Sequence, residues 1–289
     1  MNVIETFWRR PKDLPFLPTD HLFARLWARK SARFGFAAGA ALLIFVVLYP
    51  LFAPFAPNEQ IAGAKLLAPN AEHLLGTDQF GRDLLARVAS GGARSLGAAV
   101  LVLSLIVLFG IGLGTVFGLA GGILDAAAMR VIDVFLAIPP LVLALAVVGV
   151  LGPGFENLLL AILVSSLAFY TRLARSYVLA SGRRKDVVTA RLAGIGWAKI
   201  AAGHIFPRVF AQMLIVATLD LGGVIVSLAS LSFLGLGAAP PDAEWGAMLA
   251  EARSYFTFAP WLLAAPAGAI FWSVMAANLI GNALRDETK

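Results

Sequence analysis

Two polar side chains interrupt apolar stretches of the sequence. Asp220 lies within the stretch 209–236, and Asn278 lies within 258–283. A carboxylate in the middle of a bilayer costs roughly 2.5–3.5 kcal/mol on insertion scales, so Asp220 is expected to face protein or a water-filled path. There it would suit an ammonium group or a permeant cation, or it would accept a structural hydrogen bond from a neighbouring helix. For Asn278 we expect a hydrogen bond between helices.

The sequence offers little material for covalent or metal chemistry. It contains no cysteine, and its three histidines, His21, His73 and His204, lie far apart without the spacing of metal ligands. It has no recognisable Ser-His-Asp arrangement, and it lacks the Gly-x-x-x-x-Gly-Lys-Ser/Thr motif that cradles nucleotide phosphates. We therefore predict a protein that is not an enzyme and that carries no cofactor or metal ion of its own.

The composition is that of a membrane protein. Hydrophobic residues make up 60% of the 289 residues and charged residues only 14%, with a mean hydropathy of +0.84. Because a folded soluble protein needs a polar exterior, these values exclude an ordinary soluble enzyme. Six apolar stretches are each about long enough to span a bilayer: 34–56, 95–120, 126–151, 158–174, 209–236 and 258–283. The predicted fold class is an all-α polytopic membrane protein with six transmembrane helices.

The distribution of basic residues predicts the orientation in the membrane. When the six spans alternate in direction, 18 Lys and Arg residues fall on the side of the N-terminus and five on the other side. Because cytoplasmic loops are enriched in Lys and Arg, both termini are predicted to be cytoplasmic. This bias also accounts for the net charge of +6 without a nucleic-acid partner. Residues 1–33 are interpreted as a basic cytoplasmic N-terminal segment rather than a cleavable signal peptide.

The cytoplasmic loop 175–208 is basic and has a helical character. Two short helices are expected in it, joined by an elbow at Gly194-Ile195-Gly196, with the second running to Pro207. Arg191 and Lys199 would meet acidic groups on a partner. Alternatively, the loop is an amphipathic connector that lies on anionic membrane lipid.

A second motif, LLGTDQFGRDLLARV at residues 74–88, precedes the second span. Asp78 is expected to cap a helix N-terminus, and Asp83 is expected to pair with Arg87 four residues later. The motif is interpreted either as an interfacial amphipathic helix packed on the second span or as a contact to a bound solute. Its distinctive residues are Gly76, Thr77, Asp78, Gly81, Arg82 and Asp83.

Three further patterns are less specific. Asp242, Glu244 and Trp245 follow Pro240-Pro241 in an outer loop, where they would dock a soluble partner protein or anchor the loop at the membrane interface. Asp133 is expected to pair with Arg130 one turn earlier. The glycines of the second span, at positions 97, 110, 112, 114 and 118, are expected to allow close helix packing rather than to form a gating hinge.

The loop 175–208 resembles the cytoplasmic coupling loop of ABC importer permeases. The family pattern is Glu-Ala-Ala, three residues, Gly, and a stretch that ends in Ile-x-Leu-Pro. This chain departs from the pattern at Val188, Thr189 and Phe206. The 74–88 motif and the stretch 231–253 are similar to the second permease of the dipeptide, oligopeptide and nickel importers, and the resemblance covers most of residues 34–286. The matching positions of the coupling loop are Ala190, Gly194, Ile205 and Pro207.

The resemblance implies a type I ABC importer permease in a bacterial inner membrane. It implies three kinds of partner besides membrane lipid: a second homologous permease, two ATPase subunits that carry ATP and Mg, and a periplasmic or lipid-anchored substrate-binding protein that would dock on the outer loop. It divides the chain into a segment 1–33, a first span with its outer loop at 34–93, and a core permease domain at 94–286. Asp220 and Asn278 then become candidates for the translocation path.

The substrate class stays open between two choices. Because the spans contain no cysteine and no histidine, direct ligation of a bare soft metal is disfavoured, and di- or oligopeptides are preferred over nickel or another chelated metal. A stand-alone secondary transporter or channel is the alternative from another class, and it would leave the basic loop unexplained. A membrane enzyme is the remaining alternative, and it would need clustered His, Asp or Ser at the ends of the spans.

Overall fold

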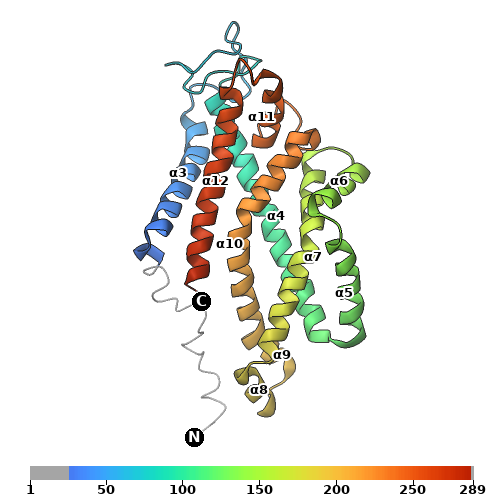
Figure 1. The fold of residues 1–289 in the computed structure, drawn as a ribbon. Helices are drawn as coiled ribbons and strands as arrows, with labels where there is room; N and C mark the ends of the chain where they lie inside the picture. Colours follow the sequence, from blue (N-terminus) through green and yellow to red (C-terminus); the bar gives the residue numbers. More distant parts are fainter. Residues whose placement is uncertain (1–25, 288–289) are drawn as a thin grey trace.

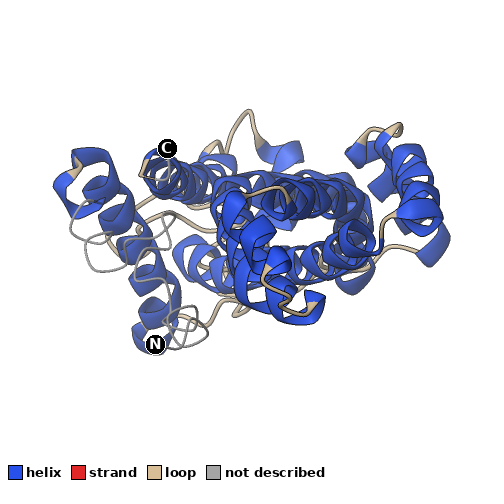
Figure 2. Cartoon of the chain, turned by 90° about the horizontal axis from the view of Figure 1, so that it is seen from below, coloured by secondary structure: helices blue, strands red, loops and turns tan. Residues whose placement is uncertain are grey.

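A computed structural model of the chain describes residues 26–287, and in that range it consists of helices and connecting loops (Figures 1 and 2). Residues 1–25, which make up most of the predicted N-terminal segment 1–33 and include His21, lie outside the described residues. An isolated antiparallel bridge joins Thr77 to Asp83 in a loop. The predicted all-α architecture is confirmed.

Long helices run side by side along the molecule (Figure 1). Five helical segments of the described chain are long and apolar enough to cross a membrane, and α5 with α6 makes a sixth when the two are taken as one broken span. The helices that form these spans are α3 (Lys30–Phe52), α4 (Leu84–Ala120), α5 (Gly122–Leu136), α6 (Pro140–Leu151), α7 (Phe155–Gly182), α10 (Phe206–Leu231) and α12 (Trp261–Asp286).

The third predicted span is not one straight helix. The stretch 126–151 divides into α5 and α6, which meet at an angle of 93°. Pro139 and Pro140 lie at the break. The cause is local, because a proline has no N–H to donate and disfavours helical backbone in the residue before it. The lower end of α5 lies beside the end of α7, where Arg175 binds Asp125, and the end of α6 leads to Gly154, whose N–H donates to the Leu236 carbonyl. The bent pair thus connects the two ends of the bundle.

The fifth span begins earlier than the sequence predicts. The helix α9 (Trp197–Ile200) continues through a π-helical turn at Ala201–Ile205 directly into α10. The expectation of a separate short helix ending at Pro207 is therefore wrong. The N–H of Phe206 bonds to the Ala201 carbonyl, five residues earlier. This wider turn lets the helix pass the proline, which occupies the first turn of α10. A second π-helical turn, Ser232–Leu236, ends the span.

The core is built where helices approach closely. Glycines 110, 114 and 118 of α4 lie against α7, and a Cβ at Gly114 would stand 2.6 Å from the Ala174 Cβ and 2.8 Å from the Arg175 N. A Cβ at Gly281 of α12 would stand 3.0 Å from the backbone of Leu219 in α10. Gly97 and Gly112 have no such neighbour within 4 Å. The predicted role of the glycines in close helix packing is therefore confirmed for the face of α4 that contacts α7, where small residues let the two backbones approach closely.

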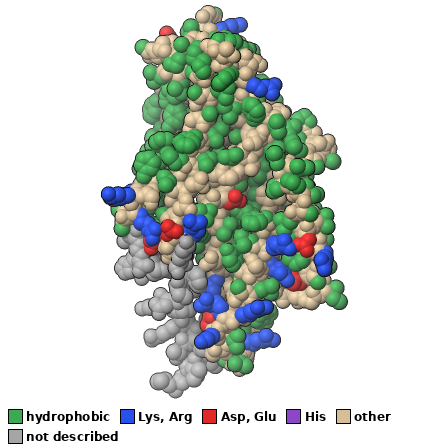
Figure 3. All heavy atoms as spheres, in the orientation of Figure 1, with side chains coloured by type: hydrophobic (Ala, Val, Ile, Leu, Met, Phe, Trp, Pro, Cys, Tyr) green, Lys and Arg blue, Asp and Glu red, His purple; other side chains and the backbone are tan. Residues whose placement is uncertain are grey.

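Charged residues gather at the ends of the bundle, and a wide apolar band lies between them (Figure 3). One end carries α8 (Lys185–Leu192) and α9, and the other carries α11 (Trp245–Ala252) and the long loop before α4 (Figure 1). The start of α3 and the end of α12 lie together, because Arg29 pairs with Asp286 at 3.2 Å and with Glu287 at 2.7 Å. The first and the last of the described residues therefore lie at the same end of the bundle.

Candidate functional site

The 76–83 motif folds as a buried loop rather than as an interfacial amphipathic helix. Thr77 and Asp78 are almost fully buried. The hydroxyl of Thr77 accepts from the Leu67 N–H at 2.9 Å and donates to the Ala64 carbonyl. Gly76 has φ +79°, and a Cβ there would stand 2.4 Å from the Leu67 oxygen. Only glycine fits this left-handed turn, which folds the outer loop onto itself.

Three buried charged side chains and one partly buried carboxylate form an ion cluster beneath this loop, which we call the outer cluster: Asp78, Arg82, Arg87 and the partly buried Glu251. Arg82 donates from Nε to Asp78 at 2.5 Å and from Nη2 to Glu251 at 2.9 Å. Arg87 lies 3.4 Å from the same Asp78 oxygen and 3.6 Å from Glu251. Because two cations meet two carboxylates, the charges balance, which is the condition for burying them. The outer cluster ties the loop and the start of α4 to α11.

The two aspartates of the motif exchange the roles predicted for them. Asp83, not Asp78, caps α4, because its carboxylate accepts from the Ala86 N–H at 2.8 Å. Asp83 pairs with the buried His73 at 2.9 Å instead of with Arg87. The sequence contained the signal for the cap, since Asp83 stands immediately before the apolar run 84–86. Glu251 and His73 are partners that the sequence analysis missed, and no local spacing points to them.

The outer-loop trio divides between buried and exposed residues. Glu244 and Trp245 are 0% exposed, so a docking protein cannot reach them in this conformation. Glu244 caps α11 through the N–H groups of Gly246 and Ala247, both at 2.9 Å, and it accepts from Ser95 of α4 at 3.0 Å. Asp242 alone of the trio lies on the surface, where it pairs with Arg94. The docking prediction is therefore wrong for Glu244 and Trp245.

The loop between α7 and α10 forms a compact projection with two sides. Ala190 and Ile205 are fully buried and join the hydrophobic core of the bundle, and Pro207 is partly buried at the foot of α10. Gly194 has φ +77° and forms the elbow after α8. Arg191 and Lys199 are exposed on the surface of the projection. The Arg191 guanidinium lies 5.7 Å from the centre of the Trp197 ring.

An ion pair fixes this projection to α10. The carboxylate of Asp186, in the first turn of α8, lies 2.5 Å from Arg208. Burial raises the pKa of Asp186, but the hydrogen bond and the charge of Arg208 outweigh burial and hold the pKa below its ordinary value. Asp186 is therefore ionised at neutral pH and α8 stays attached to α10.

A cavity that is open to the surface lies beside Asp220, and its wall includes the exposed residues Gly223 and Ser227. The carboxylate of Asp220 accepts a hydrogen bond from the Tyr170 hydroxyl at 2.9 Å, so the predicted bond to a neighbouring helix is present. The cavity has a volume of about 310 Å³. Its wall combines the α5–α6 break with α7 and α10 and contains hydroxyl groups from Ser165, Ser166 and Ser227.

Comparison with known proteins identifies the family. Residues 110–286 match the model of the binding-protein-dependent transport system inner membrane component. The chain is 39% identical over 261 residues to the nickel transport system permease protein NikC of Escherichia coli K12, covering 90% of this chain and 94% of NikC. It is 37% identical over 278 residues to the dipeptide transport system permease protein DppC of Haemophilus influenzae, covering 94% of each. The chain belongs to this family of transport permeases.

A third relative is named for a different transported solute. The glutathione transport system permease protein GsiD of Escherichia coli is 37% identical over 294 residues, covering 96% of each chain. The resemblance inferred from the three sequence motifs is thereby confirmed. As a member of this family, the protein is an inner membrane component of a transport system.

Asn278 does not join Asp220 in the permease interior. It is exposed on α12 and does not line the cavity. Its side-chain amide makes no hydrogen bond within residues 26–287, so the expected bond between helices is absent there. A Cβ at Gly222 of α10 would stand 3.5 Å from the Asn278 oxygen, which shows that α12 and α10 pack closely at this position.

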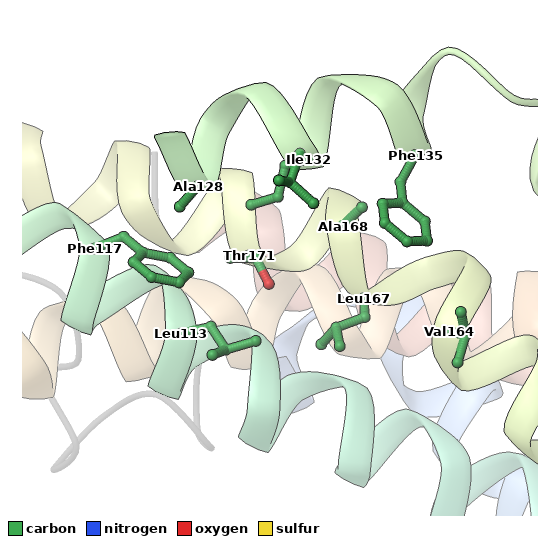
Figure 4. Close-up of a pocket in the computed structure, with 10 residues that line it drawn as sticks. Leu113, Phe117, Ala128, Ile132, Phe135, Val164, Leu167, Ala168 and Thr171 are labelled. Carbon is green, nitrogen blue, oxygen red and sulfur yellow. The ribbon is translucent and has the colours of Figure 1, made fainter. Parts of the chain in front are cut away.

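A second, apolar cleft of about 330 Å³ lies between α4, α5 and α7 of the permease (Figure 4). The Thr171 hydroxyl points into it among carbon side chains such as Leu113 and Phe117 (Figure 4). Near the same helices, Asp133 binds Arg172 of α7. The predicted pair with Arg130 is therefore wrong, because α7 brings a closer cation to the same carboxylate.

Proposed function

We propose that this chain forms half of the translocation path of an ATP-driven, binding-protein-dependent importer of di- and oligopeptides. Its match to the permease family over residues 110–286 carries the proposal. The other half of the path would come from a second homologous permease. Two ATPase subunits with their ATP and Mg would bind inside, and a periplasmic or lipid-anchored binding protein would deliver the solute outside.

The projection between α7 and α10 is the proposed contact with an ATPase. Leu192 is 84% exposed and Trp197 43%, and both lie close in sequence to the exposed cations Arg191 and Lys199. Such apolar surface with basic side chains suits a groove lined by acidic groups. ATP binding would close the ATPase dimer, and the segment 186–207 would move as a rigid lever. The bundle would then alternate between outward and inward access.

Peptides are preferred because Asp220 and the hydroxyls around it suit the amino group of a peptide. The named dipeptide permease DppC supports the same class. The 39% identity to NikC favours the alternative, nickel or another chelated metal. For either substrate class, we propose that this chain moves the solute without covalent chemistry and without a cofactor of its own.

The test is a mild-detergent pull-down of the tagged chain from its native host, with partners counted by mass spectrometry. The proposal predicts one related permease and two ATPase subunits per chain. A binding protein that co-purifies can be titrated with dipeptides and with a nickel chelate to separate the two substrate classes. Isolation of the chain alone, with solute transport in vesicles that lack ATP, would instead show a secondary transporter.

A further inference from the structure

The environment of Asp220 differs from that of the other aspartates in the spans. Asp125 and Asp133 of α5 each pair with an arginine of α7. Asp220 has no ion pair within residues 26–287 and accepts only the hydrogen bond from Tyr170. Because an ionised carboxylate at this depth is costly, it calls for a positive partner or for water. The cavity beside it is the place where that partner would bind.

The hydrogen-bonding groups of the cavity are mostly acceptors. The Ser165 hydroxyl donates to the Ile162 carbonyl at 3.0 Å, and the Ser227 hydroxyl donates to the Gly223 carbonyl at 2.9 Å. The Tyr170 proton is likewise committed to Asp220. Each of these oxygens therefore offers lone pairs and no free proton. A solute with several N–H donors matches this wall, whereas a carboxylate or phosphate would meet acceptors and negative charge.

The break in the third span adds a backbone acceptor. Leu136, Ile138 and Pro140 line the same cavity as Asp220. Leu136 is the last residue of α5, so its carbonyl has no intrahelical donor, and no backbone N–H of the described loop replaces one. Broken helices whose backbone carbonyls face a cavity near the bilayer middle form cation sites in other transporters. The cavity volume of about 310 Å³ lies at the lower end of the roughly 300–1,000 Å³ typical of small-molecule sites.

We propose that this cavity is a subsite for the protonated amino group of the solute during its passage. Asp220 is the counter-ion, Tyr170 orients the carboxylate, and Ser165, Ser227 and the Leu136 carbonyl accept the remaining N–H bonds. An ammonium group donates three hydrogen bonds, and its positive charge supplies the ion-pair partner that Asp220 does not have within residues 26–287. The polar side-chain atoms of the wall are all oxygens, which suit an ammonium group better than a soft metal ion. This inference rests on the proposed function, because it assigns a substrate class to the same path.

The absence of cysteine in the chain allows a direct test of the charge preference. Ser227→Cys places a thiol on the cavity wall, in the full complex with both permeases, the ATPases and the binding protein. Its reaction rates are measured with a cationic and an anionic methanethiosulfonate reagent. The Ile123→Cys variant, at a residue that is 89% exposed at the start of α5 and outside the proposed ATPase contact, measures the reference ratio of the two rates. The expected ratio at position 227 exceeds that at 123 by at least about tenfold and collapses when Asp220→Asn is added.

Uptake of dialanine by the same complexes in proteoliposomes completes the test. Asp220→Asn should lower uptake at least about tenfold and leave complex assembly and ATPase activity stimulated by the binding protein within about twofold. Asp220→Glu should restore most of the uptake. Equal reagent ratios at positions 227 and 123, or uptake by Asp220→Asn at the wild-type rate, would overturn the subsite.

These outcomes are distinct from a failure of the proposed function. If the wild-type complex does not assemble with ATPases or does not take up dialanine with ATP, the importer proposal for peptides fails before any variant is compared. If Asp220→Asn does not assemble, the reagent ratio at Ser227→Cys in the presence of Asp220 still decides, because a ratio equal to that at Ile123→Cys contradicts a cation-selective cavity.

Discussion

At the scale of single residues, the outer cluster should contribute far more to stability than an exposed ion pair. Arg82 is 2% exposed and satisfies both Asp78 and Glu251, so Arg82→Met would leave two carboxylates with one cation. We expect the free energy of unfolding to fall by about 3–5 kcal/mol, because removal of one buried partner leaves an uncompensated charge. Unfolding in lipid nanodiscs, followed by tryptophan fluorescence, measures this change.

Arg94→Met is the matched control for this prediction. The ion pair between Arg94 and Asp242 lies at the same end of the molecule as the outer cluster, but its two side chains are 36% and 51% exposed. Water screens such a pair, and we expect a loss below about 1 kcal/mol. Equal losses for the two variants would show that the outer cluster does not hold the loop to α11.

The chemistry of the 76–83 motif was predictable from the sequence only in part. Asp83 before an apolar run is a local signal for a helix cap, and the left-handed turn at Gly76 is also a local property. The pairing of Arg82 with Glu251 spans 169 residues and depends on how α11 folds back over α4. No spacing in the sequence encodes that distance, so the partners of a motif can be found only when the tertiary fold is known.

At the scale of helices, the contact between α4 and α7 should depend on Gly114. A Cβ there would stand 2.6 Å from the Thr171 carbonyl oxygen, and that backbone atom cannot move aside as a side chain could. Gly114→Ala is expected to lower the free energy of unfolding by about 1–3 kcal/mol through overpacking. Gly112→Ala, with nothing within 4 Å, should be neutral or stabilise by a few tenths to about 1 kcal/mol. A common loss in both variants would mean that helix propensity in lipid, not contact, sets the outcome.

The projection between α7 and α10 should loosen when its ion pair is removed. Asp186→Asn breaks the pair with Arg208 and should speed tryptic cleavage at Arg184 or Lys185 about two- to fivefold, as expected for a partly exposed pair. Because the pKa of Asp186 is depressed, its contribution is fully present above the ordinary aspartate pKa and is lost as pH falls through the lowered value.

The cleavage difference between Asp186→Asn and wild type should therefore stay constant between about pH 6 and pH 8. Lys199→Gln, which changes an exposed residue beyond the elbow, should leave the rate of cleavage at 184–185 unchanged. A difference that is absent at pH 6 and appears only as the pH rises through this range would show that the contact with Arg208 does not lower the pKa of Asp186.

The element that the sequence predicted least well is the third span. Its apolar length indicated one crossing, and Pro139-Pro140 marked a place where helical hydrogen bonds fail. The angle of 93° between α5 and α6 could not be predicted, because it is set by packing of both pieces on α7. The same tertiary packing places the α5–α6 break beside Asp220. The sequence could therefore predict a functional carboxylate at position 220 but not the cavity around it.

At the scale of the whole molecule, the number of crossings decides where the two ends of the chain lie. Five long helical segments with α5–α6 as a re-entrant pair would place the ends on opposite sides of a membrane, whereas a broken sixth span places them on the same side. The pairs of Arg29 with Asp286 and Glu287 require one side. The geometry of the bundle thus favours six crossings, the number predicted from the six apolar stretches of the sequence.

Sided labelling of single cysteines tests this topology, and the chain needs no background substitutions because it contains no cysteine. A membrane-impermeant maleimide added from the periplasmic side should react with Ala71→Cys before α4 and with Glu156→Cys at the start of α7. Inverted vesicles should expose Ile123→Cys at the start of α5 and Leu192→Cys in α8, which are 89% and 84% exposed. Labelling of the 123 and 156 variants from the same side would make α5–α6 re-entrant and leave five crossings. A complete reversal of all four would keep the six spans but contradict the orientation, since the basic loops would then face outward against the usual bias.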